Sequence, residues 1–178
     1  MFKLNPHPDD DDLAARGKAG APLHDILVID AHVHFGVVAG FPCKDGGPDE
    51  LVAAMDRLGI RYAYVSNLAA VYGLDRTGND ELLAALRRHP ARLRGYMTLN
   101  PGYPATILPE MERCHAAGLR AVKIWSYGNR PGLPYTHANY AIIFDFANTH
   151  GLPILAHTWG EEVDQLEPAF KKDRKSVV

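Results

Sequence analysis

The sequence predicts an α/β fold of the (β/α)8 TIM-barrel type that stops after about five of its βα units. Apolar segments typical of strands alternate with segments whose apolar residues recur at helical spacing. The strand starts lie about 27–35 residues apart, which is the length of one βα unit. Histidines end the first and fifth strands, and a barrel carries its active site at such carboxyl ends.

Five strands are expected in the 178-residue chain, at residues 26–34, 61–68, 93–100, 120–126 and 153–158. The first of them, ILVIDAHVH, begins as a run that is apolar on both faces. Such a run suits a strand that is buried within a parallel sheet. Parallel strands joined by helices imply right-handed crossovers.

Helices are expected between the strands, each with a start or stop signal. Asp49 is expected to cap the helix DELVAAMDRL, and Asn79 the helix NDELLAALRR. A further helix is expected to begin near Glu161. The residues that stop the first four helices are Gly59, Pro90, Gly118 and Gly151.

Two architectures fit this alternation, a barrel and an open doubly wound sheet. A nucleotide-binding sheet usually has a glycine-rich turn after its first strand, but this strand ends in His32-Val33-His34, which favours the barrel. A complete barrel takes about 250 residues, so residues 26–178 are expected to form a partial one. Residues 1–25 are expected to form an irregular leader. Open sheet edges recruit partners, and a homo-oligomer is therefore expected.

Composition excludes several classes of protein. The chain has 19 basic and 21 acidic residues and a net charge of −2, so no nucleic-acid or membrane surface is expected. No apolar run approaches the roughly 20 residues that a membrane span needs. Cys43 and Cys114 match neither a disulfide framework nor a CxxC metal knuckle. These features predict a protein in the reduced, cytoplasmic setting.

The histidines point to a metal centre. Side chains alternate along a strand, so Asp30, His32 and His34 are expected on one face. Two imidazoles on adjacent positions of that face can bind one metal ion, and His157 ends the fifth strand in a position to join them. Three imidazoles and a water are a ligand set of catalytic zinc, so the expected cofactor is a divalent metal, with zinc preferred.

Four further residues are candidates for the site. Asp30 could orient a metal-binding histidine, or it could end a buried polar network. Lys123 on the fourth strand could hold a substrate anion near the barrel mouth, or it could extend its ammonium into water. We name both as candidate catalytic residues. Arg130 and Trp159, in the loops after the fourth and fifth strands, are candidates for substrate binding.

Four segments together resemble the amidohydrolase superfamily: IDAHVHFG, NDELLAALRRHPARLRGYMTLNP, GLRAVKIW and PILAHT. The resemblance covers roughly residues 26–170 and is strongest to the metal-dependent hydrolases that also include decarboxylases of aromatic and unsaturated acids. It implies a (β/α)8 barrel with metal bound by His32, His34 and His157. It also implies a carboxylated lysine bridging two metals in some members, for which Lys123 is placed.

The resemblance implies a hydrolase that acts on a small carbonyl or carboxylic substrate through metal-activated water, or a metal-dependent decarboxylase. The family's later histidine and its aspartate base have no counterpart in this sequence, which implies impaired catalysis by the short chain. Two further hypotheses remain. One is an inactive partial barrel that binds metal or a partner, and the other is a doubly wound domain with a coincidental histidine pair.

Overall fold

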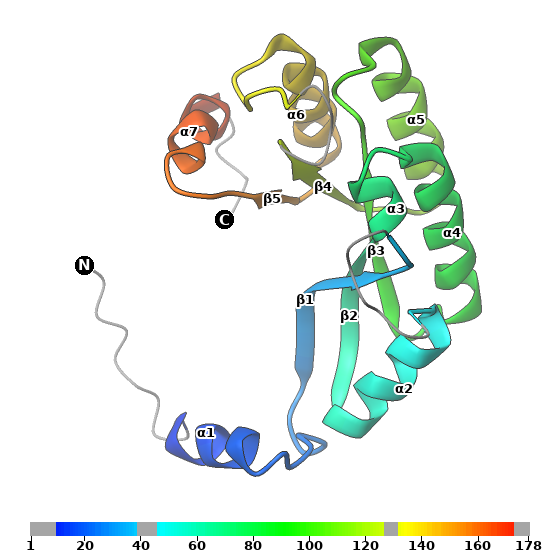
Figure 1. The fold of residues 1–178 in the computed structure, drawn as a ribbon, viewed down its shortest axis with the longest axis vertical. Coiled ribbons are helices and arrows are strands. Elements are labelled where there is room, and N and C mark those ends of the chain that lie inside the picture. The colour runs from blue at the N-terminus through cyan, green and yellow to red at the C-terminus, as the bar shows by residue number, and fades with distance from the viewer. Residues whose placement is uncertain (1–9, 39–45, 127–131, 173–178) are drawn as a thin grey trace.

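A curled half-barrel of five parallel strands forms the centre of the molecule, in the computed structural model that describes residues 10–38, 46–126 and 132–172. Neighbouring strands follow one another in chain order, as in the predicted βα repeat (Figure 1). The strands are β1 (Val28–Phe35), β2 (Ile60–Asn67), β3 (Leu93–Thr98), β4 (Ala121–Trp125) and β5 (Ile154–His157). The predicted α/β fold of barrel type is confirmed.

The helices lie mainly on the outer side of the curled sheet, where Figure 1 shows α2, α4, α5 and α6. Within the described residues, no helix is both long and apolar enough to cross a bilayer. The helices are α1 (Asp10–Lys18), α2 (Pro48–Leu58), α3 (Leu68–Val71), α4 (Asp75–Arg88), α5 (Pro104–Ala116), α6 (Ala138–His150) and α7 (Glu162–Lys172).

The hydrophobic core joins the sheet to these outer helices. Buried aliphatic residues of the central strands belong to one cluster with buried residues of α4, α5 and α6. Its members include Val65, Leu93, Met97, Val122, Ile124, Leu82, Met111 and Ile143. Burial of this face fixes the register of the strands, because a slip by one residue would turn the apolar set toward solvent.

A helix occupies part of the segment that we expect to be an irregular leader. Helix α1 spans Asp10–Lys18, and alanines with a basic last turn favour it. The Arg16 guanidinium donates to the carbonyl of Pro22 at 3.1 Å and pairs with Asp25, which ties the helix to the chain before β1. The expectation of an irregular segment is therefore wrong over these nine residues.

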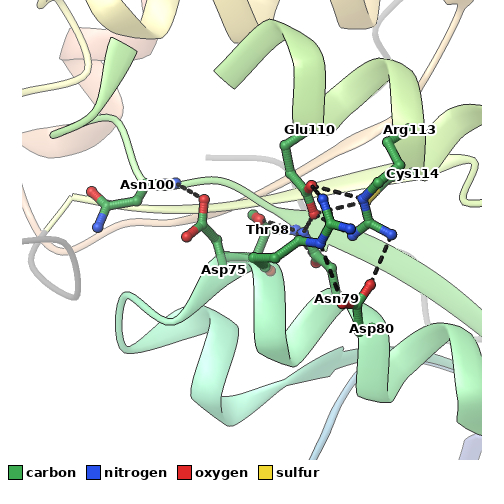
Figure 2. Close-up of polar contacts among 9 residues, drawn as sticks. Asp75, Asn79, Asp80, Thr98, Asn100, Glu110, Arg113 and Cys114 are labelled. Carbon is green, nitrogen blue, oxygen red and sulfur yellow. Dashed lines mark hydrogen bonds and ion pairs between the residues drawn. The ribbon is translucent and has the colours of Figure 1, made fainter. Parts of the chain in front are cut away.

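The expected cap Asn79 lies inside α4, which begins four residues earlier, at Asp75. Its buried side chain binds both main-chain groups of Thr98 in β3, accepting from N–H at 3.0 Å and donating to the carbonyl at 2.9 Å. It also donates to the carboxylate of Glu110 in α5 at 3.0 Å (Figure 2). The polar residue joins a helix to the sheet, and the prediction of a cap is wrong.

Strand β1 is less buried than its apolar sequence predicts. It pairs with β2 alone among the described strands, and Ile29 is 50% exposed. Exposed apolar residues continue on both sides of it, at Ile26, Leu27 and Val37. The expectation of a buried first strand is wrong, since a strand at a sheet edge has a neighbour on one side only.

This exposed edge leads to a prediction about self-association. We expect Ile29→Lys to shift the chain toward monomer in sedimentation velocity at micromolar concentration, because a charge on an edge strand opposes edge-to-edge pairing. Leu108→Lys is the matched control, since Leu108 is a similarly exposed apolar residue on a helix. Equal oligomer distributions for both variants and the parent protein would show that β1 does not mediate association.

Candidate metal centre

His32 and His34 bring their side chains together at the carboxyl end of β1. Their Nε2 atoms lie 3.2 Å apart, and the two rings meet edge to face. A register shift between Asp30 and Val33 gives β1 one more residue than the matching stretch of β2, as in a β-bulge. Just beyond β1, Gly36 has φ of +98°, a conformation that favours glycine and turns the chain out of the sheet.

The donor chemistry of this pair fits a divalent metal ion. Two nitrogen ligands bound to one ion at about 2.0–2.1 Å lie roughly 3–3.4 Å apart, depending on the coordination angle. The 3.2 Å separation of the two Nε2 atoms falls in that range. The pKa of each imidazole also lies below its ordinary value, so both rings are neutral near pH 7, as metal ligands must be.

Ser66 at the end of β2 sets the tautomer of His34. The Nδ1 atom of His34 lies 2.9 Å from the Ser66 hydroxyl and 3.4 Å from its main-chain carbonyl oxygen. Because the carbonyl can only accept, this contact favours a proton on Nδ1 and leaves the lone pair on Nε2. Burial, followed by the neighbouring His32, lowers the pKa of His34 to about 4.

Lys123 extends from β4 to the histidine pair. Its Nζ atom lies 3.4 Å from Nε2 of His32, and the residue is 1% exposed. Burial lowers the pKa of the Lys123 amine to about 8, so that it remains largely a cation at pH 7. Partial burial and then the charge of Lys123 lower the pKa of His32. The alternative of an ammonium extended into water is excluded.

His157 ends β5 opposite Trp125 of β4, but it does not complete a three-residue cluster. Among the described residues, no group of three metal-binding side chains is gathered at one point. The Nε2 atom of His157 instead accepts the indole N–H of Trp159. His157 is still near enough for its charge to lower the pKa of both His32 and His34.

The other candidates are placed as follows. Asp30 pairs with Ala63 and His34 with Ser66, positions of opposite parity on β2, so the bulge separates Asp30 from the face of His34. The prediction of one shared face is wrong for Asp30, whose carboxylate accepts the main-chain N–H of His32 at 3.0 Å. Trp159 is 70% exposed beside His157. Arg130 lies outside the described residues.

A buried polar network behind His157 includes Ser126 and Glu162, which were not among the sequence candidates. Tyr135 donates its hydroxyl to the His157 carbonyl at 2.5 Å. Glu162 accepts the main-chain N–H of Trp159 at 2.8 Å with one oxygen and the Ser126 hydroxyl with the other. Ser66 and Ser126 carry the signal that revealed the histidines, a polar residue at the carboxyl end of a strand. Glu162 carries no comparable signal.

Comparison with protein families gives a match over most of the chain. A family model of amidohydrolases matches residues 29–172, which run from the second residue of β1 to the end of α7. No curated protein gives a significant match.

Solved structures share the fold at low sequence identity. A 5-carboxyvanillate decarboxylase from Novosphingobium aromaticivorans, in complex with manganese, is 18% identical, with a TM-score of 0.62 over 82% of this chain and 54% of that one. A protein assigned as a 2-pyrone-4,6-dicarboxylic acid hydrolase from Acinetobacter baumannii is 15% identical, with a TM-score of 0.62 over 83% and 55%. A TIM-barrel protein from Bordetella bronchiseptica is 10% identical, with a TM-score of 0.67 over 86% and 66%. The chain spans about half the length of the first two structures.

Proposed function

Because the chain belongs to the amidohydrolase family, we propose that it binds a divalent metal ion through His32 and His34 and acts on a small carbonyl or carboxylic substrate. The observation that carries this proposal is a pair of neutral imidazoles at the carboxyl end of β1, whose Nε2 atoms lie 3.2 Å apart. A bound metal ion would polarise a substrate carbonyl or activate a water molecule. Zinc is the expected ion, and manganese is the ion in the decarboxylase structure of the same fold.

The chain's own residues have distinct roles in this proposal. His34 donates its Nδ1 proton in a hydrogen bond to Ser66, which leaves the Nε2 lone pair available to bind the ion. Lys123, a buried cation beside His32, attracts the carboxylate or the developing negative charge of the substrate. Asp30 fixes the main chain of the bulge that carries His32. Trp159 and Arg130 are proposed to contact the substrate, and His157 to bind the metal as a third ligand.

Hydrolysis through metal-activated water is the main proposal, and decarboxylation of an aromatic or unsaturated acid is the second. The observation that favours the second is Lys123, because a buried ammonium suits a substrate that carries a carboxylate. The exposed indole of Trp159 would add an apolar face for an aromatic ring.

An assay with two substrate classes distinguishes the two reactions. The protein is loaded with Zn²⁺ or Mn²⁺ and incubated with each substrate class in turn. With hydroxybenzoic acids the release of CO2 is measured, and with aryl esters and lactones the release of acid is measured. We expect metal-dependent turnover of one class, and its loss in His34→Ala. His24→Ala is the control, since His24 is an exposed histidine before β1. Turnover of neither class with metal bound would overturn the catalytic proposal.

A further inference from the structure

We infer that Trp159 acts as a latch: its indole N–H holds the Nε2 atom of His157 in a hydrogen bond until a metal ion displaces the indole. This inference rests on the proposed metal centre and adds a contact that sets the affinity of that centre for the ion. It follows from one contact, the hydrogen bond from the Trp159 indole N–H to Nε2 of His157. It also explains why His157 does not join His32 and His34 in one cluster among the described residues.

The bond from Trp159 uses the atom that His157 would need for a metal. A neutral imidazole has one acceptor nitrogen, and here that nitrogen is Nε2 because indole N–H can only donate. The same lone pair cannot accept the indole proton and bind an ion at once. Binding of an ion by Nε2 of His157 therefore requires the indole of Trp159 to leave.

The main chain on both sides of this pair is held by buried groups. The hydroxyl of Tyr135, which is 1% exposed, donates to the carbonyl of His157. The buried carboxylate of Glu162 accepts the main-chain N–H of Trp159 and is itself bound by the Ser126 hydroxyl, next to the end of β4. Because the backbone is fixed at both residues, only the side chains can move when a metal ion replaces the indole.

The two aromatic neighbours of His157 differ in their freedom to move. Trp125 packs on the imidazole from β4, with ring centroids 5.2 Å apart, and is only partly exposed. Trp159 lies 5.6 Å from it, centroid to centroid, and is 70% exposed. The indole of Trp159 can therefore swing into solvent at the loss of few contacts, whereas the ring of Trp125 keeps His157 in place.

The latch predicts a spectroscopic signal on metal binding. The chain has two tryptophans, so Trp159 becomes the only one in Trp125→Phe. In that protein we expect Zn²⁺ to change the indole emission over the concentration range in which calorimetry shows binding. The change should be absent when His157→Ala is added, although His32 and His34 still bind Zn²⁺. Circular dichroism checks that each variant keeps its helix content.

The latch also predicts a gain in affinity when it is removed. Trp159→Phe keeps an aromatic ring but lacks the N–H, and we expect it to bind Zn²⁺ about fivefold more tightly, the effect of one competing hydrogen bond. Unchanged emission during binding, or equal affinity in Trp159→Phe, would overturn the latch and leave the metal centre intact. Absence of Zn²⁺ binding in both the parent protein and Trp159→Phe would overturn the metal centre, and the latch with it.

Discussion

Asn79→Ala is expected to lower the free energy of unfolding by about 3 kcal/mol, because three hydrogen bonds to buried groups are lost at once. Two of them join α4 to the main chain of Thr98 in β3, and the third joins it to the carboxylate of Glu110 in α5. Alanine removes these bonds from the Thr98 groups in a site too buried for ready hydration.

The charge of Glu110 adds to the cost of this substitution. Burial works to raise the pKa of the Glu110 carboxyl, but hydrogen bonds from Arg113, Asn79 and Cys114 outweigh it, so the pKa lies below its ordinary value. Removing Asn79 leaves that buried carboxylate with fewer donors. Urea unfolding followed by circular dichroism measures the change. Asn148→Ala, at an exposed position of α6, is the control and should shift the free energy by less than about 0.5 kcal/mol.

Lys123→Met is expected to stabilise the metal-free protein at pH 7 by about 2 kcal/mol, although it removes a proposed site residue. A buried ammonium costs folding free energy, and this cost appears as a pKa of about 8 in place of the ordinary 10.5. Methionine fills a similar volume without a charge. A loss of stability in Lys123→Met would show that the contact of the amine with His32 outweighs its desolvation.

The lowered pKa of Lys123 also makes the stability of the parent protein depend on pH. Between about pH 8 and 10.5 the unfolded chain keeps the Lys123 proton while the folded protein releases it, so stability rises with pH through this window. Urea unfolding at intervals across the window should show the rise, and it should be absent in Lys123→Met. Lys18→Met, at an exposed position of α1, is the control that keeps it.

The order and type of the five strands and of helices α2, α4, α5, α6 and α7 could be predicted from the sequence, because each βα unit repeats the same local signals. Glycine stops at Gly59 and Gly151, for example, coincide with helix ends in left-handed backbone conformation. The exposure of β1 could not be predicted, because an apolar run has the same sequence at the edge of a sheet as at its centre. The predicted role of Asn79 was wrong for a related reason, since the amide side chain that caps a helix also suits hydrogen bonds to a buried main chain.

The candidate site could be predicted to the level of residues but not of geometry. His32, His34 and Lys123 meet because they lie at or near the carboxyl ends of strands. Asp30 departs from its expected face because a bulge, which leaves no signal in a two-residue periodicity, lies between it and the histidines. The contact of Trp159 with His157 depends on the side-chain conformations of the loop after β5 and could not be predicted from spacing.

Calorimetric titration of the chelator-treated protein with Zn²⁺ and Mn²⁺ tests the metal centre most directly. With His32 and His34 as ligands, we predict saturable binding of an ion, and about 100-fold weaker binding in His32→Ala and in His34→Ala, because a single imidazole holds an ion poorly. His24→Ala should bind as the parent protein does. Binding of neither ion by the parent protein, or equal affinity in His32→Ala, would contradict the assignment of the metal centre to this pair.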